Sequence, residues 1–172
     1  MEKLEKCEAG CRIGTKFCGV LAYADVLTLL CPSVRGLQSM LNICEEFGRE
    51  YGLVFNEKKT LCIKFGNNCR DHGDVFMSGS KLVWKDSVRH LGNMLHSDLT
   101  DKADINFKKG CFYHYVNKVI VLFGSLPCHT VDYLFNAYCT SFYGSQTWDL
   151  NSRYIVDMYI AWQKSVRHLA FT

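Results

Sequence analysis

Residues 20–30 read Val-Leu-Ala-Tyr-Ala-Asp-Val-Leu-Thr-Leu-Leu, and this stretch decides the expected fold of the N-terminal half. Two short apolar runs, 20–23 and 27–30, flank an acidic tip at 24–26, a pattern typical of two strands joined as a hairpin. The tip lacks the Asn-Gly or Asp-Gly pair that two-residue hairpin turns prefer. Local turn chemistry therefore does not explain Asp25, and we expect another requirement to have placed it there.

A helix is expected directly after the hairpin. Pro32 and Ser33 precede a segment with apolar side chains at helical spacing, and Gly52 ends it. These apolar positions are Leu37, Met40, Leu41, Cys44, Phe47 and Tyr51. An extended segment then covers 53–65, interrupted by the polar run 56–60. The first part of the chain thus reads β-β-α-β.

The pattern changes to helical near residue 96. Residues 66–79 are expected to form a surface loop, and 81–84 and 88–95 are short strand candidates. Three helices follow, which end before Pro127, at Gly144 and near the C-terminus. The expected apolar face of the first helix is Ile105, Phe112, Val116, Val119, Ile120 and Phe123. That of the second helix is Val131, Leu134, Phe135, Tyr138 and Phe142. That of the third helix is Ile155, Tyr159, Trp162, Val166 and Leu169. Asp101 and Asp104 suit the first turn of the first helix. We place a domain boundary between 95 and 96.

Composition favours a globular chain of one or two small units. Of 172 residues, 48% are hydrophobic and 22% charged, which is enough apolar material for one ordinary core. The net charge is +3 and the pI about 8.3, below the value above about 9 that marks a persuasive nucleic-acid footprint. Charge alone therefore does not identify a partner.

Targeting signals and metal motifs are lacking in the sequence. Residues 1–10 have no apolar core of the kind a secretory signal needs, and the run 20–31 is too short to span a membrane. The ten cysteines contain no Cys-x-x-Cys pair, and the histidines have no i, i+4 pairing, which disfavours zinc. We expect an intracellular protein of the cytoplasm or nucleus whose cysteines are reduced.

The hairpin tip and the segments that follow it carry a family resemblance. Tyr23-Ala24-Asp25-Val26 resembles the Y-A-D-D box of reverse transcriptases of non-LTR, LINE-type retrotransposons, with valine in place of the second aspartate. Gly36-Leu37-Gln38 with its helix, and Gly52 to Thr60, resemble the segment G-L-x-x-N-x-x-K-[TS] that follows the box. Order and spacing both match.

The resemblance continues into the C-terminal half and covers about residues 11–169. Val88-Arg89-His90-Leu91-Gly92 is similar to the Y-L-G primer-grip hairpin, with histidine where tyrosine is usual. Phe142 to Trp148 resembles L-Y-G-S-E-T-W, and Trp162 to Arg167 resembles the basic helix beyond it. The resemblance implies an α+β fold with a partial palm at 1–95 and a helical thumb-like region at 96–172.

The resemblance also implies a catalytic site that is degenerate here. The family uses two Mg²⁺ ions held by the two aspartates of the box and a third from an upstream strand, which would precede Met1, as would the fingers. Asp25 is the residual metal-ligand position, and Val26 replaces the second carboxylate. We expect no bound Mg²⁺ and no polymerase activity. Lys59 matches a lysine that in the family lies near the nucleotide pyrophosphate. Without a bound nucleotide, the preferred interpretation of Lys58 and Lys59 is that they are solvated turn residues, with Asn56 capping the turn.

Substrate contacts implied by the family fall on Tyr23, Asn56, His90, Leu91 and Gly92. Basic and aromatic side chains of the helical region offer further contacts to RNA or DNA: Lys108, Lys109, Lys118, Arg153, Lys164 and Arg167, with Tyr113, Tyr115 and Trp162 for stacking. Basic residues on helices more often form just the solvated face. Exposure of Leu21, Tyr23, Leu27 and Leu29 at an open palm edge would favour self-association.

Three hypotheses remain open from the sequence. The first is a retrotransposon remnant without activity. The second is a module reused by the host to bind nucleic acid or protein without catalysis. The third is a polymerase completed by another chain, which would require Asp25 to work without its neighbour.

Overall fold

The structure is a computed structural model that describes residues 2–66 and 73–170. It is a mixed α+β protein and divides into two compact units, Met1–Lys85 and Asp86–Thr172. The division falls between Lys85 and Asp86, whereas the sequence analysis placed it between 95 and 96. The hairpin at 87–96 therefore belongs with the helices, because its contacts are made to the first of them.

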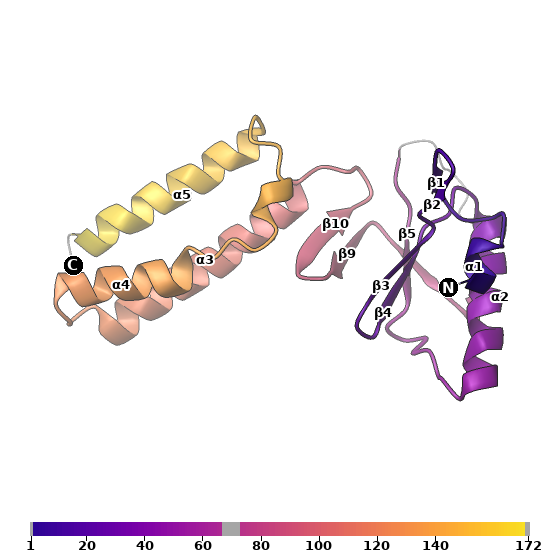
Figure 1. Ribbon diagram of the computed structural model, residues 1–172. Helices are drawn as coiled ribbons and strands as arrows, with labels where there is room; N and C mark the ends of the chain where they lie inside the picture. The colour runs from indigo at the N-terminus through magenta and orange to yellow at the C-terminus, as the bar shows by residue number, and fades with distance from the viewer. Residues whose placement is uncertain (1, 67–72, 171–172) are drawn as a thin grey trace. The chain divides into compact units, whose positions relative to one another are not determined.

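Two hairpins open the first unit, after a short helix α1 (Glu2–Glu5). Strands β1 (Arg12–Ile13) and β2 (Lys16–Phe17) form the first hairpin, which the sequence analysis missed. Strands β3 (Val20–Tyr23) and β4 (Val26–Leu29) form the second, which confirms the predicted hairpin (Figure 1). Its turn is the pair Ala24-Asp25, and Ala24 has φ 51°, a left-handed conformation that costs a residue with a Cβ about 1–2 kcal/mol.

Helix α2 (Val34–Tyr51) confirms the predicted helix and its boundaries. The hydroxyl of Ser33 accepts a hydrogen bond from the Gly36 N–H, and Gly52 ends the helix with φ 69°, as left-handed C-terminal glycines do. The face formed by Met40, Leu41 and Cys44 is buried. Two positions were assigned to this face wrongly, because Phe47 and Tyr51 stack on each other at the surface, with ring centroids 4.4 Å apart.

The other strands of the first unit are short and pair two by two in the part of the chain that the structure describes. Strand β5 (Leu61–Ile63) pairs in parallel with β8 (Val83–Lys85), and β6 (Phe76–Met77) pairs with β7 (Ser80–Lys81). The expected loop at 66–79 thus contains a strand, while 67–72 lie outside the described residues. Sequence patterning missed β6 because a two-residue strand has no periodicity to detect.

Helix α2 satisfies the backbone of β6 through its side chains. The Gln38 amide donates to the Phe76 carbonyl at 2.9 Å and accepts from the Phe76 N–H at 2.8 Å, and the Glu45 carboxylate accepts from the Ser78 N–H. Two apolar clusters form the core of the unit: Leu41, Cys62, Val75, Met77 and Leu82; and Leu4, Val20, Met40 and Cys44.

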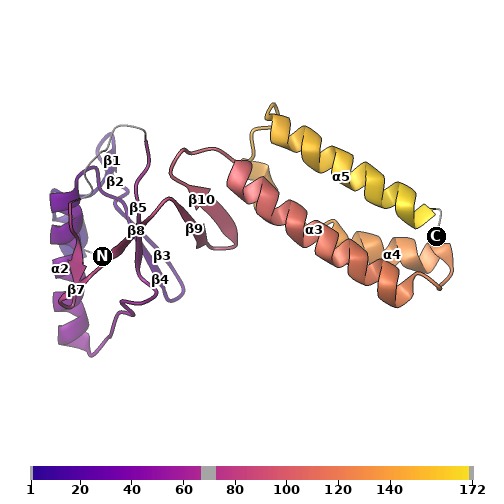
Figure 2. The ribbon, with the colours of Figure 1, turned by 180° about the vertical axis from the view of Figure 1, so that it is seen from behind.

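The second unit combines one hairpin with three helices. Strands β9 (Ser87–His90) and β10 (Asn93–His96) precede α3 (Lys102–Phe123), α4 (Cys128–Cys139), the short 3-10 helix η1 (Ser145–Thr147) and α5 (Arg153–Ala170). Both α4 and α5 lie along α3, as the two opposite views show (Figures 1 and 2). No described helix combines the length and apolar character needed to cross a membrane.

One buried cluster holds the three helices together, and it corrects three predicted positions. It comprises Ile105, Phe112, Val116, Val119, Val131, Phe135, Cys139, Trp148, Met158 and Ala161. Tyr138, Tyr159 and Trp162 were predicted to face inward but are exposed. On α5 the buried face runs through Met158, Ala161 and Ser165, and Ile155, Val166 and Leu169 pack partly buried against the cluster.

Candidate functional site

The tip of the β3–β4 hairpin carries the residues expected to remain from a catalytic box. Tyr23 and Val26 form the last cross-strand pair, and Asp25 is exposed in the turn between them. Tyr23 is 68% exposed and Val26 37%. Nowhere in residues 2–66 and 73–170 do three or more His, Cys, Asp or Glu side chains converge as a metal would require. Asp25 is thus not part of such a group among the described residues.

Apolar exposure on this hairpin follows the sequence prediction in three of four positions. Leu21 is 55% exposed, and Tyr23 and Leu27 are exposed as well. Leu29 was assigned to the exposed edge wrongly, since it packs against both apolar clusters of the first unit. The exposed edge therefore lies toward the tip of the hairpin, and its base is anchored.

The predicted residues Asn56 and Lys59 meet in one turn. The Asn56 side-chain oxygen accepts from the Lys59 N–H at 3.2 Å, and its carbonyl accepts from the Thr60 N–H and hydroxyl at 3.0 and 2.9 Å. These bonds confirm the reading of Asn56 as a turn cap. Lys59 is exposed, and among the described residues no hydrogen bond or ion pair joins it to Asp25. A shallow pocket beside this turn is lined by Val54, Phe55, Asn56, Glu57 and Lys58.

The primer-grip-like motif forms a tight turn in the second unit. Leu91 and Gly92 connect β9 to β10 and have φ 46° and 85°, and His90 pairs with Asn93 at the end of the ladder. Such a two-residue turn with both φ values positive matches the twist of a hairpin. Leu91 occupies a conformation that favours glycine or asparagine, so the turn keeps an apolar, 40% exposed side chain at a local energetic cost.

The segment 142–148 packs directly on this turn. A Cβ built on Gly92 would lie 3.1 Å from the Tyr143 ring, and a Cβ on Gly144 would overlap the side-chain amide of Asn93. Gly144 also has φ 81°. Two glycines thus permit the close approach of two motifs that are about fifty residues apart in the chain.

A buried polar cluster fixes the hairpin to the helices. The Asp104 carboxylate, 5% exposed, accepts from the Met94 N–H at 2.8 Å, the Lys108 ammonium at 2.5 Å and the Trp148 indole N–H at 2.7 Å. Lys108 also donates to the Asn93 side-chain oxygen at 2.7 Å. We call Asp104, Lys108, Trp148, Asn93 and the Met94 N–H the Asp104 cluster. It connects β10, α3 and the 142–148 segment in a single hydrogen-bonded group.

The charges of this cluster stabilise each other. Burial alone raises the pKa of Asp104, but the hydrogen bonds from Lys108, Met94 and Trp148 outweigh it, and the net pKa is lowered. The carboxylate therefore stays ionised at neutral pH. Lys108 was predicted to be a nucleic-acid contact, but it is only 8% exposed and is paired inside the unit.

Sequence reasoning missed the Asp104 cluster, although the signal was present. Asp104 was assigned to the helix dipole, yet it lies beside Ile105 and one turn before Lys108 on the face that continues through Phe112 and Val116. An Asp and a Lys at i and i+4 within an apolar face indicate a buried ion pair, because neither charge is stable there alone.

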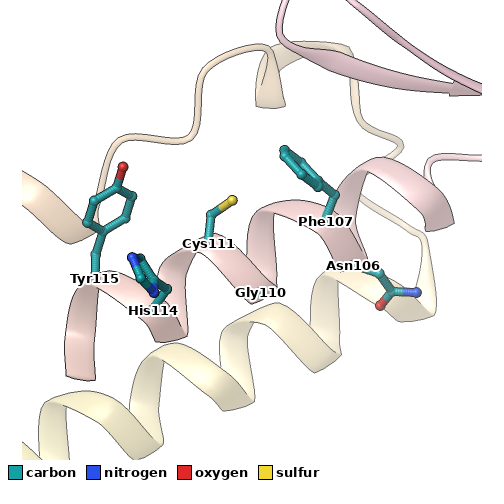
Figure 3. A pocket seen from close by; sticks show the side chains of 6 residues that line it. All are labelled: Asn106, Phe107, Gly110, Cys111, His114 and Tyr115. Carbon is teal, nitrogen blue, oxygen red and sulfur yellow. The ribbon is translucent and has the colours of Figure 1, made fainter. Parts of the chain in front are cut away.

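An open groove lies on the exposed face of α3 (Figure 3). Asn106, Phe107, Gly110, Cys111, His114 and Tyr115 line it. The Arg89 guanidinium, from β9, lies 5.1 Å from the centre of the Phe107 ring, within the range of a cation–π contact. Tyr115 is 45% exposed. The groove thus offers aromatic faces beside a cation.

The charge on α3 outside the core is entirely positive. Its one acidic residue is Asp104, which is buried and paired, whereas Lys102 and Lys118 are exposed and Lys109 is half-buried. Lys118 follows His114 by four residues and therefore continues the groove face. Apart from the buried Asp104, α3 itself carries no carboxylate.

Comparison with models of protein families, with curated proteins and with solved structures yields no match for this chain.

Proposed function

We propose that this chain is a reverse-transcriptase-like fragment derived from a non-LTR retrotransposon, without polymerase activity of its own. The observation that carries the proposal is the β3–β4 hairpin, because its two-residue turn presents Asp25 beside Val26 in the order of the degenerate box. The hairpin turn at Leu91-Gly92, packed against 142–148, adds support from a second motif pair.

The absence of activity rests on the chemistry of the tip. Two-metal catalysis requires several convergent carboxylates, and Val26 supplies an apolar side chain where the second would stand. One exposed carboxylate competes poorly with water for Mg²⁺, which binds through octahedral sets of oxygen ligands. The ions that the family uses are Mg²⁺. In this chain Asp25 would be the remaining protein ligand of the box.

A manganese titration tests this proposal, since Mn²⁺ substitutes for Mg²⁺ and its free concentration is measured by electron paramagnetic resonance. The native chain and the Asp25→Ala variant are expected to give the same isotherm. A saturable Mn²⁺ site in the native chain that Asp25→Ala removes would show that the tip remains a working metal site, and the proposal would be wrong.

The second candidate is a nucleic-acid-binding module without catalysis, favoured by the groove on α3. Phe107, His114 and Tyr115 offer stacking faces, while Arg89 and Lys118 supply positive charge at its two ends. Stacking on aromatic side chains and neutralisation of phosphates are the two contributions that sequence-tolerant binding of single strands requires. The ligand class is therefore single-stranded RNA or DNA, with weak affinity.

Gly110 provides a matched pair of variants for this candidate. A Cβ at Gly110 meets nothing within 4 Å, so Gly110→Gln and Gly110→Glu should both fold and differ by one charge in the groove. Fluorescence anisotropy with a labelled single-stranded oligonucleotide at low salt should show weaker binding by Gly110→Glu, by roughly tenfold, about 1.4 kcal/mol. Equal affinities of the two variants, or no saturable binding by the native chain, would reject this candidate.

A further inference from the structure

Two cysteines face each other at the open end of the β1–β2 hairpin. The register pairs Arg12 with Phe17 and Ile13 with Lys16, so the next pair outward is Cys11 with Cys18. The Cys18 N–H donates to the Cys11 carbonyl at 2.9 Å, which shows that the ladder continues to this pair. Side chains directly opposite in an antiparallel pair lie on the same face of the ladder.

The spacing of such a pair suits a disulfide. Directly opposite residues of antiparallel strands have Cα atoms about 4.5–5.5 Å apart. A disulfide requires Cα atoms about 4.4–6.8 Å apart. Both cysteines are free thiols and both are partly accessible to solvent. Bond formation between them therefore needs rotation of the side chains and little movement of the backbone.

The surrounding backbone already holds the two strands together. A Cβ built on Gly19 would lie 2.8 Å from the Gly10 Cα, so these two glycines bring the chain segments that carry the cysteines into close contact. The Cys11 N–H donates to the Leu30 carbonyl at 2.9 Å, and the Leu30 N–H donates to Gly19 at 2.7 Å. The cysteine pair is thus connected to the base of the β3–β4 hairpin.

A third thiol stands nearby but has another partner. The Cys31 Sγ donates to the Ala9 carbonyl at 2.7 Å. Burial is the main cause that raises the pKa of the Cys11 thiol, and the Cys18 and Cys31 thiols add to it. Within the described residues these thiols do not form a group that could hold a metal ion.

We propose that Cys11 and Cys18 are a site of reversible oxidation, at which a peroxide closes a disulfide across the base of the β1–β2 hairpin. Because burial raises the pKa of the Cys11 thiol, the Cys18 thiolate is the group that attacks the peroxide. The O–O bond breaks, and a Cys18 sulfenic acid and one water form from hydrogen peroxide. The second thiol then attacks the sulfenic sulfur and releases a second water. Two thiols and one hydrogen peroxide thus give one disulfide and two waters, and a dithiol reductant reverses the reaction by exchange.

The disulfide would constrain the strand that leads to the Asp25 turn. Cys18 is followed directly by Gly19 and β3, so a covalent link there restricts the segment from which the β3–β4 hairpin extends. The inference does not depend on the reverse-transcriptase proposal, because it requires only the strand register and two thiols.

Peptide mapping of the full chain tests the proposal. After treatment with hydrogen peroxide, alkylation and non-reducing trypsin digestion, cleavage at Lys6, Arg12, Lys16 and Arg35 separates peptide 7–12 from peptide 17–35. A linked pair of these peptides that dithiothreitol releases is the expected product. Because each peptide holds two cysteines, Cys7→Ser and Cys31→Ser should retain the link, while Cys11→Ser and Cys18→Ser should lose it.

Two results would overturn the proposal. One is a link that persists in Cys18→Ser, which would assign the disulfide to another cysteine pair. The other is the lack of any linked peptide in the native chain at a peroxide dose that fully oxidises free glutathione in the same tube. Circular dichroism of each serine variant confirms that the fold is retained, so that a lost link reports the missing thiol.

Discussion

A carboxylate placed among apolar side chains raises the free energy of the folded chain unless donors surround it. Asp104 has three donors, from a lysine, an indole and a backbone amide, and each comes from a different part of the second unit. Removal of one partner of such a buried pair typically costs about 3–5 kcal/mol, because the other charge stays buried. Single residues of this cluster therefore control the stability of the unit.

Asp104→Asn should lower the free energy of unfolding by about 3–5 kcal/mol, because the buried Lys108 loses its counter-charge. Urea denaturation followed by far-UV circular dichroism measures the change. The matched control is Lys81→Met, which breaks a half-exposed pair with Asp74 and should cost less than about 1 kcal/mol. Equal effects of the two variants would mean that the Asp104 cluster contributes no more than a surface ion pair.

The pH dependence of the free energy of unfolding should report the ionisation of the Asp104 carboxylate. The folded pKa of Asp104 is lower than its unfolded value of about 3.9, so its contribution is complete above about pH 4 and is lost as the pH falls through the folded pKa. Native and Asp104→Asn chains should therefore approach each other in stability as the pH is lowered from 6 toward 3. A difference that stays constant over this range would contradict the lowered pKa.

Glycines at two positions have opposite effects on the elements that contain them. Gly110 lies within α3 and a Cβ there meets no atom within 4 Å, so its only effect is the conformational freedom that it gives the unfolded chain. Gly144 has φ 81° and leaves room for the side chain of Asn93. The structure thus requires glycine at 144 and merely tolerates it at 110.

Gly110→Ala should stabilise the chain by about 0.5–1 kcal/mol, whereas Gly144→Ala should destabilise it by at least about 1–2 kcal/mol, the cost of a left-handed conformation alone. Thermal unfolding of both variants beside the native chain measures the two shifts. If Gly144→Ala were as stable as the native chain, the close packing of the 142–148 segment on the β9–β10 hairpin would be wrong.

Elements with strong periodicity could be predicted from the sequence, and those fixed by tertiary contacts could not. The spacing of Met40, Leu41 and Cys44 together with Ser33 and Gly52 defined α2 with its boundaries. The turn at Asp25 followed from two apolar runs. Strand β6 has only two residues and therefore shows no periodicity in the sequence. Its position depends instead on tertiary contacts, because the Gln38 side chain bonds its backbone. On α5, the buried side chains are Met158, Ala161 and Ser165, so Tyr159 and Trp162 were misplaced.

In the candidate site, too, local turns could be predicted from the sequence and tertiary contacts could not. Asp25 and Asn56 lie in turns, as their sequence patterns led us to expect. The single strand candidate 88–95 was wrong, because the chain turns at Leu91-Gly92 and divides the segment into β9 and β10; only the family resemblance implied a hairpin there. The Asp104 cluster and the groove on α3 depend on contacts between segments far apart in the chain, which one sequence does not reveal. Lys108 was predicted to be a surface cation because its partner, Asp104, was assigned to the helix dipole and not to an ion pair.

At the scale of the whole molecule, each of the two units has its own buried clusters. The tip of the β3–β4 hairpin, which carries Asp25 and Val26, is exposed. A tip that is not integrated into a core adds little to stability, so substitutions there change chemistry with little effect on folding. Variants of Asp25 and Val26 should therefore be folded, and their activities can be compared directly.

The most direct measurement is primer extension on an RNA template with Mg²⁺ or Mn²⁺, using the native 172-residue chain, Val26→Asp and Asp25→Ala. The proposal predicts no extension by the native chain or by Asp25→Ala, because a single carboxylate at the tip does not make a two-metal site. Extension by Val26→Asp alone would assign the loss of activity to Val26. Extension by the native chain that Asp25→Ala abolishes would contradict the proposal and would show that the hairpin tip is a working polymerase site.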